Sequence, residues 1–415
     1  MIRGVRLPAS TQRRSSSRSA RRSVSPARKR ASASSGSASD LSIGVDIGGT
    51  KMLGVAVDRS DRIVAEARVL TPHAALDPVE PHAVGSEELG GPHDHSSVDV
   101  RNAGRSVGVG VGVGVGVGVG VEVADAVAEV VESLHHQLEG HSASPPRGPG
   151  RRSSAVHVPV GVGAPGMLDR EGVLRFSPNL QGATGADLRT LVADRLAGTP
   201  VVVENDANCA ALAELRLGAV RGAADALVVT LGTGIGGGIV SGDRVLVGAF
   251  GFAGEIGHMV VDPSGPPCPC GRRGCWERYA SGGGLARLAR EAAYAGRLNE
   301  VVALAGGDPE LVRGEDVTRA ARRGDAGALG VMDELGWWIA LGLTNLTAVL
   351  DPERIVLGGG LGEAEEMVLV PTRRAFAHLV EGSGARPDVE IVVAELGERA
   401  GAVGAAMVAR AGGLG

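Results

Sequence analysis

Three of the four cysteines in this 415-residue chain lie within eight residues, and a histidine precedes them. Cys268, Cys270 and Cys275, together with His258, offer three thiolates and one imidazole, a set that binds Zn²⁺ tetrahedrally. The intervening proline and glycine residues favour a tight loop, which has no C-x-x-C pair of the redox type. The pattern predicts a structural zinc site, and unrelated buried cysteines are the alternative. Cys209 lies in a helical pattern and is expected to be an inert core residue.

The segment from Glu204 to Asn208 reads ENDAN and follows a short apolar strand that begins at Pro200. Such a strand would deliver Asn205 and Asp206 to its carboxyl end, where α/β proteins place their ligands. A carboxylate beside the following helix N-terminus stays ionised and can accept a proton from a substrate hydroxyl group. Helix capping by Asp206 or Asn205 accounts for the same residues equally well.

Two glutamates bracket the cysteine loop, Glu255 before it and Glu277 after it. If His258 gives one ring nitrogen to zinc, its other nitrogen stays free to meet a ligand. The three side chains could then hydrogen-bond sugar hydroxyl groups, with zinc fixing one wall of the site rather than activating water. By position alone, however, the two glutamates are expected to be solvated surface charges.

A glycine-rich turn between two expected strands follows Asp46 in the segment DIGGTK. Backbone N–H groups of Gly48, Gly49 and Thr50 could point at phosphate oxygens. Asp46 could hold Mg²⁺, directly or through water, because this hard cation prefers oxygen ligands. The segment does not fit the P-loop pattern, and an ordinary tight turn is the alternative.

A second turn of this kind, LGTGIGGG, contains G-x-G-x-x-G at Gly232, Gly234 and Gly237. Strand residues follow these glycines where a dinucleotide-binding helix would begin, so we reject a dinucleotide site. Three glycines at 358–360 follow another strand and offer an approach to a nucleoside. Together the turns favour a nucleoside triphosphate clamped between two similar α/β halves that face each other across a cleft.

The charge is unevenly distributed along the chain. Residues 1–40 carry ten Arg and Lys against one acid, a balance of +9 that leaves −14 for the rest. This Ser/Arg-rich tail is expected to be disordered, and so acidic a body disfavours nucleic acid as a partner. Four cysteines are too few for a disulfide framework, and no long apolar stretch predicts a membrane span. The cytoplasm is therefore the expected compartment.

Two domains are expected after the tail. Residues 41–158 are expected to form a small α/β domain that a C-terminal helix at 397–415 completes. Residues 71–121 form an insertion in it, and the valine–glycine repeat at 107–121 predicts low complexity, strand at best, since alternate glycines leave one face unpacked. Residues 159–396 are expected to form a large α/β domain that carries the zinc loop at 258–277.

Eight segments occur in the order GVDIGGTK, GVGAPG, PNL, VVVENDANCAALAE, LGTGIGGGIV, AGEIGH, CPCGRRGCWE and IVLGGGL. Together they resemble the ROK family (repressor, ORF, kinase), most closely its bacterial glucokinases, over residues 41–70 and 122–410. The resemblance implies an α/β fold of the two-domain, actin-like ATPase (ribonuclease H-like) type with an inter-domain cleft. It implies an enzyme that transfers the γ-phosphoryl group of ATP to the 6-hydroxyl group of glucose, with Mg²⁺ and a structural Zn²⁺. It also implies a homodimer or homotetramer.

The resemblance further implies a role for each matching position. Asp206 would be the catalytic base. The sugar-contacting positions would be Asn179, Asn205, Glu255, His258 and Glu277. The zinc ligands would be His258, Cys268, Cys270 and Cys275. The nucleotide-binding positions would be Asp46, Gly48, Gly49, Thr50, Lys51, Gly232, Thr233, Gly234 and Gly236, to which the residues alone add Gly358, Gly359 and Gly360.

Two features keep alternatives open. After PNL the related glucokinases often have a tryptophan, whereas this chain reads QGATGAD. Fructose, mannose, allose or N-acetylmannosamine therefore remain candidate acceptors, and polyphosphate a candidate donor. Some family members are sugar-responsive repressors with an N-terminal helix-turn-helix, but residues 1–40 show no amphipathic helix pair.

Overall fold

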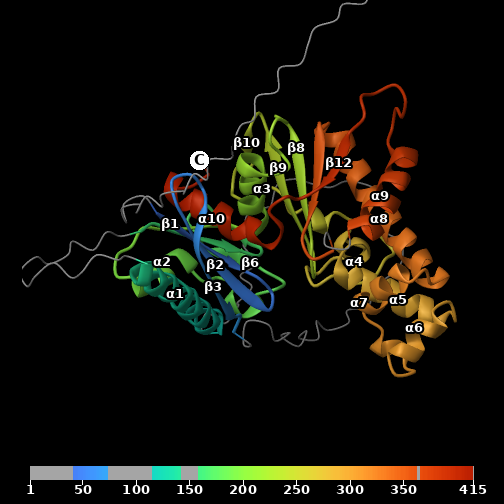
Figure 1. The fold of residues 1–415 in the computed structure, drawn as a ribbon, viewed down its shortest axis with the longest axis horizontal. Helices are drawn as coiled ribbons and strands as arrows, with labels where there is room; N and C mark the ends of the chain where they lie inside the picture. Colours follow the sequence, from blue (N-terminus) through green and yellow to red (C-terminus); the bar gives the residue numbers. More distant parts are fainter. Residues whose placement is uncertain (1–40, 73–114, 142–157, 362–364, 415) are drawn as a thin grey trace, which may run out of the picture. The chain divides into compact units, whose positions relative to one another are not determined.

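The computed structural model describes residues 41–72, 115–141, 158–361 and 365–414. The Ser/Arg-rich tail and most of the expected insertion, up to residue 114, lie outside the described residues. The described part contains two five-stranded sheets and one two-stranded sheet (Figure 1).

The first sheet has the strand order β3-β2-β1-β4-β7. Its members are β1 (Ser42–Ile47), β2 (Lys51–Val57), β3 (Ile63–Leu70), β4 (Val160–Ala164) and β7 (Val201–Asn205). The first three strands are antiparallel, which confirms the expected strands on either side of the first glycine turn, and the last two add in parallel. Because β4 and β7 pair in this sheet, it extends past residue 158, where the sequence placed a domain boundary. The sheet ends only at Asn205.

The second sheet repeats this topology in the order β10-β9-β8-β11-β12. Its members are β8 (Ala226–Leu231), β9 (Ile235–Ser241), β10 (Arg244–Val245), β11 (Arg354–Gly358) and β12 (Glu390–Val393). β10, β9 and β8 are antiparallel, and β11 and β12 add in parallel. The repeat confirms the expectation of two similar α/β halves, each opening on a strand–turn–strand unit.

Helices cover both faces of the first sheet. Alternate residues of β2 point to opposite faces: Met52 belongs to the core with Val130 of α1 (Val115–His141), whereas Val55 packs with Val403 of α10 (Ala400–Ala411). α2 (Leu188–Arg195) packs beside α1. The sheet is thus buried on both sides, as parallel strands require.

The end of the valine–glycine repeat is helical, which corrects the expectation of low complexity with strand at best. α1 begins at Val115, inside the repeat, and continues through the segment with helical spacing. Val123 and Val127 lie four residues apart, so they share a face and are fully buried. A Cβ at Gly120 would come within 2.6 Å of the Cβ of Ala186. Glycine therefore permits a close approach here that the repeat alone does not indicate.

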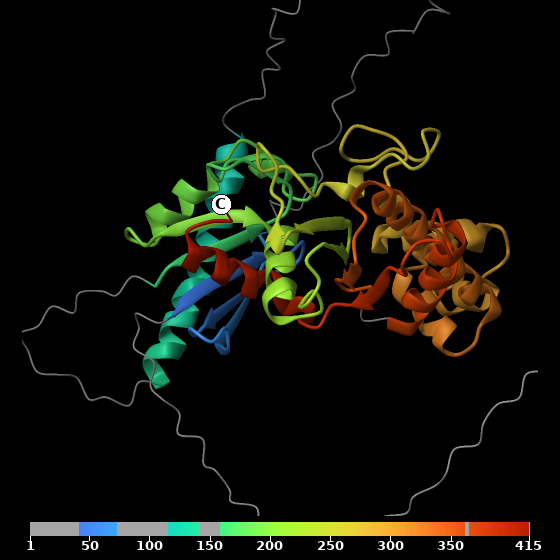
Figure 2. The same cartoon turned by 90° about the horizontal axis from the view of Figure 1, so that it is seen from above.

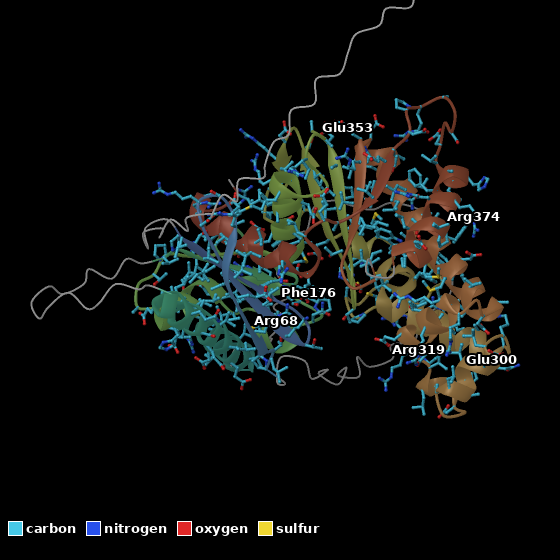
Figure 3. All side chains as sticks on the ribbon, in the orientation of Figure 1. Arg68, Phe176, Glu300, Arg319, Glu353 and Arg374 are labelled. Carbon is cyan, nitrogen blue, oxygen red and sulfur yellow. The ribbon has the colours of Figure 1, made fainter. Side chains whose placement is uncertain are left out.

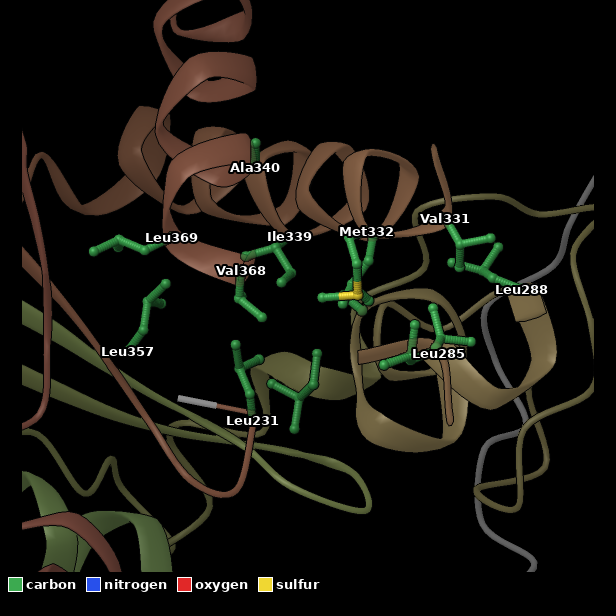
Figure 4. Packing of buried hydrophobic residues seen from close by; sticks show 14 of the residues in the cluster. Leu231, Leu285, Leu288, Val331, Met332, Ile339, Ala340, Leu357, Val368 and Leu369 are labelled. Carbon is green, nitrogen blue, oxygen red and sulfur yellow. The ribbon is translucent and has the colours of Figure 1, made fainter. Parts of the chain in front are cut away.

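The second sheet packs against a group of helices. In Figure 4, Leu231 of β8 and Leu357 of β11 face Ile339 and Val368. The helices of this region are α4 (Glu277–Ala280), α5 (Gly282–Tyr294), α6 (Asn299–Leu304), α7 (Gly314–Arg322), α8 (Ala326–Leu350) and α9 (Glu365–Leu379). The shorter elements of the chain are β5 (Met167–Leu168), β6 (Leu174–Phe176) and the 3₁₀ turns Gln181–Ala183, Ile256–His258, Pro309–Leu311 and Gly397–Arg399.

Two helices meet where the chain passes from one sheet to the other. α3 (Asp206–Leu217) follows β7 and packs tightly on α10. A Cβ at Gly404 would lie 1.8 Å from the carbonyl oxygen of Cys209. Cys209 is fully buried at this contact, as its helical pattern predicts. Within the described part of the chain, no helix is long and apolar enough to cross a membrane.

Candidate active site and metal centre

The strand-to-helix junction β7–α3 places Asn205 and Asp206 at the carboxyl end of a sheet strand. Asn205 is the N-cap of α3, and its Oδ1 accepts the N–H of Asn208 at 3.0 Å. Its Nδ2 also donates to the carbonyl oxygen of Gly166 at 3.2 Å. Asp206 is the first residue of the helix, and its Oδ1 accepts the adjacent N–H of Ala207 at 2.8 Å. The N-cap function therefore falls on Asn205, and Asp206 follows it as the first residue of the helix.

A second carboxylate lies beside Asp206. A Cβ at Gly163 would be 3.4 Å from Asp46 Oδ1 and 3.5 Å from the Cα of Asp206. Gly401, in the first turn of α10, lies against the Asp46 carboxylate: a Cβ at position 401 would be 2.6 Å from Asp46 Cγ. Burial, and then the charge of Asp206, raise the pKa of Asp46 to about 8. Burial also raises the pKa of Asp206. Two enclosed carboxylates of this kind are the hard oxygen donors that Mg²⁺ prefers.

The glutamates that bracket the cysteine loop are partly buried. The side chains of Glu255 and Glu277 are 30% and 15% exposed. Burial, and then the charges of Asp206 and Glu277, raise the pKa of Glu255 to about 7. Glu255 therefore lies in the same charged cluster as Asp206, which overturns the expectation of surface charges. His258 lies between the glutamates, with Nε2 4.0 Å from Glu255 Oε2 and Nδ1 3.6 Å from Glu277 Oε1.

The four predicted zinc ligands come together in one place. The donor atoms of His258, Cys268, Cys270 and Cys275 all lie within 4.8 Å of one another. Cys268 Sγ is 3.7 Å from His258 Nδ1, and Cys270 Sγ is 3.5 Å from Cys275 Sγ. Three sulfur atoms and one nitrogen at this spacing fit a tetrahedral Zn²⁺ site.

The loop that carries these cysteines is folded tightly onto itself (yellow in Figure 2). Gly274 has φ +64°, and a Cβ there would come 1.5 Å from the carbonyl oxygen of Asp262, so only glycine fits. The hydroxyl group of Tyr279 donates to Asp262 Oδ2 at 2.7 Å. Trp276, directly after Cys275, is fully buried against α8. The loop is therefore anchored from both sides of the ligand cluster.

Glu277 connects this cluster with the second glycine turn. Its Oε1 lies 3.2 Å from Cys268 Sγ, and its Oε2 would lie 2.8 Å from a Cβ at Gly234. Gly236, in the first residues of β9, leaves room for the Cβ of Ala207, which a side chain at 236 would meet at 3.0 Å. The turn and the start of β9 therefore lie between the metal cluster and the start of α3.

The remaining predicted nucleotide positions form turns of the expected kind. Gly48 donates its N–H to the carbonyl oxygen of Lys51 at 3.0 Å, and Gly49 and Thr50 are exposed between them. In the second turn, Gly232 donates its N–H to the carbonyl oxygen of Gly234 at 3.0 Å, and Thr233 is exposed. Gly359 has φ +82°, and a Cβ at this position would lie 2.6 Å from the carbonyl oxygen of Leu231. Residues 358–360 therefore adjoin the second turn, with Gly358 closing β11 and Gly360 exposed.

Two predicted residues are less closely tied to the cluster. Asn179 is exposed in the turn after β6 and, in the described part of the chain, makes no hydrogen bond to another site residue. Lys51 is exposed, and its Nζ lies 2.7 Å from Glu398 Oε2.

Sequence reasoning missed two supporting contacts. Glu204 Oε1 accepts the backbone N–H of Asn205 at 2.9 Å and a side-chain N–H of Asn208 at 3.1 Å. The first and last residues of the ENDAN segment are therefore hydrogen-bonded to each other across the strand-to-helix junction. Gly282, at the start of α5, donates its N–H to the carbonyl oxygen of Gly232 at 2.8 Å. The run SGGG at 281–284, with Ser281 as N-cap, was the available signal for that helix start.

The high pKa of Asp46 predicts how stability depends on pH. The folded chain keeps this proton up to about pH 8, whereas the unfolded chain releases it near the ordinary aspartate pKa of 3.8. Stability from this group is therefore full below the unfolded pKa and is lost as pH rises towards 8. We expect the melting temperature, measured without divalent cations, to fall from pH 5 to pH 9 by roughly 5 °C more in the wild type than in Asp46→Asn. Asp333→Asn, a control at an exposed position, should show the same dependence of melting temperature on pH as the wild type. If the melting temperatures of the wild type and Asp46→Asn fell in parallel, the raised pKa of Asp46 would be contradicted.

The comparisons with known proteins agree with this arrangement. Residues 150–411 match the sequence profile of the ROK family. The glucokinase of Streptomyces coelicolor is 35% identical over 373 residues, which cover 89% of this chain and 98% of that protein. The xylose repressor of Bacillus subtilis is 29% identical, over 66% of this chain and 64% of its own length.

Solved structures give the same result. The ROK family glucokinase of Streptomyces griseus, in complex with glucose and AMPPNP, has a TM-score of 0.68 and 35% identity. The match covers 89% of this chain and 99% of that one. The ROK hexokinase of Thermus thermophilus follows with a TM-score of 0.59, 31% identity, and coverage of 90% and 98%. The two matching five-stranded sheets are thus the α/β fold of actin-like ATPases, and the chain belongs to the ROK family.

Proposed function

We propose that this protein is a glucokinase that transfers the γ-phosphoryl group of ATP to the 6-hydroxyl group of glucose, with Asp206 as general base. The observation that carries the proposal is the position of the Asp206 carboxylate. It directly follows the N-cap residue Asn205 and lies in one cluster with Glu255 and Glu277, beside a glycine turn. The similarity to glucokinases over nearly the whole chain supports the choice of reaction.

Proton removal from the sugar is assigned to Asp206. Burial raises the pKa of its carboxyl group, which brings a carboxylate closer to the basicity that a hydroxyl proton requires. The sugar O6 loses its proton to Asp206 and bonds to the γ-phosphorus atom as the bond to the ADP oxygen breaks. Phosphoryl transfer needs little covalent chemistry from the protein, so the remaining contribution is positioning and charge stabilisation.

The sugar is expected to contact His258, Glu255 and Glu277, with Asn205 and Asn179 completing its surroundings. His258 would bind zinc through Nδ1, the nitrogen nearer to Cys268, and present Nε2 to the sugar. Zinc would then be structural, because its four ligands are all protein atoms. Its contribution is to hold His258 and the Glu277 wall in place.

The nucleotide is expected to bind at the glycine turns. Gly48, Gly49 and Thr50 are exposed or partly exposed on the first turn, and Gly232, Thr233 and Gly234 are so on the second. Mg²⁺, when bound, would neutralise phosphate charge, and Asp46 would hold it directly or through water. Lys51 would reach the phosphates after leaving Glu398, a pair exposed enough to exchange easily.

Acceptor and donor specificity provide the test. We expect the highest kcat/KM for glucose with ATP in a coupled assay that compares glucose, mannose, fructose, allose and N-acetylmannosamine. A second arm replaces ATP by polyphosphate, since a polyphosphate/ATP-glucomannokinase of an Arthrobacter strain shares this fold at a TM-score of 0.53. A higher kcat/KM for another sugar, or for polyphosphate, would overturn the assignment of substrate or donor.

The proposal extends to the organisation of the protein. We place one domain around the first sheet with α10, and the other around the second sheet, with the boundary in residues 218–225 between α3 and β8. A cytoplasmic homodimer or homotetramer is expected.

A further inference from the structure

The chain crosses between its two sheets at two points within the described ranges. The first crossing, residues 218–225, leads from the end of α3, which follows β7 of the first sheet and, among the strands, packs mainly against β8 and β9, to β8 of the second sheet. The second crossing, residues 394–399, connects β12 of the second sheet with α10 on the first.

One buried carboxylate binds both crossings. Glu214, in the last turns of α3, is 0% exposed. Its Oε2 accepts the N–H of Ala219 at 2.7 Å, in the first crossing, and the N–H of Glu395 at 3.2 Å, in the second. Its Oε1 accepts the N–H of Leu396 at 2.9 Å. These contacts join segments that are about 180 residues apart in sequence.

The local sequence makes room for this carboxylate. A Cβ at Gly218 would lie 2.0 Å from Glu214 Oε2, so a side chain at 218 would displace it. The carboxylate can accept all three bonds because it has several lone pairs and carries no hydrogen when ionised. Buried backbone N–H groups left without an acceptor are costly, so the three bonds hold the crossings together.

The second crossing is held from the other side as well. Glu398 pairs with Lys51 and Arg68, and Arg399 pairs with Glu66 (Arg68 is labelled in Figure 3). Hydrogen bonds from Arg68 and then Lys51 lower the pKa of Glu398 to about 2. These exposed pairs attach residues 398 and 399 to the first sheet, while Glu214 attaches residues 395 and 396 to α3.

The two helices whose connecting segments Glu214 binds, α3 and α10, each contact the pair of buried carboxylates at the predicted active site. Asp206 opens α3, about two helical turns from Glu214. Gly401, directly after the second crossing, lies against the Asp46 carboxylate. The separation of the two carboxylates therefore depends on how α3 and the start of α10 are held together.

We propose that Glu214 is a positioning residue that ties the two crossings together and thereby sets Asp206 and Asp46 at the distance that phosphoryl transfer requires. The inference rests on the proposed kinase function. Glu214 touches no substrate in this account. It acts on kcat through the helices rather than on sugar binding.

Glu214→Gln is the discriminating variant. Its amide nitrogen would face backbone N–H groups and could not accept from them, so at least one of the three bonds is lost. We expect kcat to fall about tenfold, while the Kd for glucose, measured by calorimetry without nucleotide, changes less than twofold. Glu214→Asp keeps the carboxylate but shortens the side chain by one methylene group, so we expect a kcat between those of the wild type and Glu214→Gln. A kcat within twofold of the wild type in folded Glu214→Gln would overturn the proposal.

Glu353→Gln is the matched control (Glu353 is labelled in Figure 3). Glu353 Oε1 also accepts a backbone N–H of the first crossing, that of Ala224 at 3.1 Å, but it binds no residue of the second crossing. Because the glutamine oxygen can still accept this N–H, the variant should lower stability slightly at most and leave kcat unchanged. An equal fall in kcat in both variants would indicate general destabilisation and would also overturn the proposal.

Hydrogen exchange separates this inference from the proposed function. Glu214→Gln should speed amide exchange at both crossings and near residues 46 and 206, whereas Glu353→Gln should affect the first crossing alone. If the wild type shows no kinase activity, the proposed function fails, but this exchange pattern still decides whether Glu214 positions both carboxylates. Faster exchange confined to residue 219 would contradict the positioning role.

Discussion

Asp206→Asn is expected to lower kcat by about 10³-fold, within the range that a general base contributes. Asparagine has nearly the same shape but cannot take the proton from the sugar hydroxyl group. Asn205, not Asp206, caps α3, so the substitution should leave the helix start intact. Glucose affinity, measured by calorimetry, should therefore change little, and the loss should appear in kcat.

The matched control for Asp206→Asn is Asp325→Asn. Asp325 is the N-cap of α8, and its Oδ1 accepts the N–H of Ala328 at 2.7 Å. This change also replaces a carboxylate at a helix start, but it should affect stability rather than kcat, and only modestly because asparagine also caps well. A kcat of Asp206→Asn close to that of the wild type would refute the base assignment.

Cys270→Ser is expected to remove most of the bound metal and to raise the glucose KM by about ten- to a hundredfold, an effect typical of disturbed metal sites. Cys270 is partly exposed, so the substitution leaves the core packing of the loop in place. Its loss should release His258 and Glu277, which lie 3.6 Å apart beside Cys268. Metal analysis of protein purified without added metal should find about one zinc per wild-type chain, as one Cys₃His set requires.

Cys209→Ala provides the control for metal content. Cys209 is buried in the contact between α3 and α10, away from the cysteine loop, so this variant should keep one zinc per chain. Full activity of metal-free wild-type protein would contradict a structural role for the metal. Full zinc content in Cys270→Ser would contradict the ligand assignment.

Much of the candidate site could be predicted because its signals are local. The spacing of Cys268, Cys270 and Cys275 within one loop indicated the ligand set, and the structure places their donor atoms together. The strand–turn–strand units at Gly48 and Gly232 were predictable because glycine turns and strand periodicity act over a few residues. The strand that leads into ENDAN was predictable for the same reason.

Other features depended on tertiary contacts. The valine–glycine repeat alternates like a strand, yet its last residues are helical because Val123 and Val127 bury one face against the first sheet. From their sequence positions alone, Glu255 and Glu277 were expected to be solvated surface charges. In the fold they are partly buried near Asp206. The sequence did not show that the first sheet extends past residue 158, because pairing between strands far apart in sequence cannot be recognised from either strand alone.

By itself, the sequence determined the local chemistry of this protein: the ligand types in the cysteine loop, the glycine turns, and the carboxylate that follows β7. Only the tertiary structure decided which of these meet. Asp46 and Asp206 become neighbours through the parallel pairing of β1, β4 and β7, and Gly401 reaches Asp46 from the far end of the chain. Glu214 shows the same limit, because the N–H groups that it accepts belong to segments brought together only when both sheets and both helices are packed. Local patterns follow from short-range backbone and side-chain preferences, whereas these contacts arise from burial that the whole chain must satisfy at once.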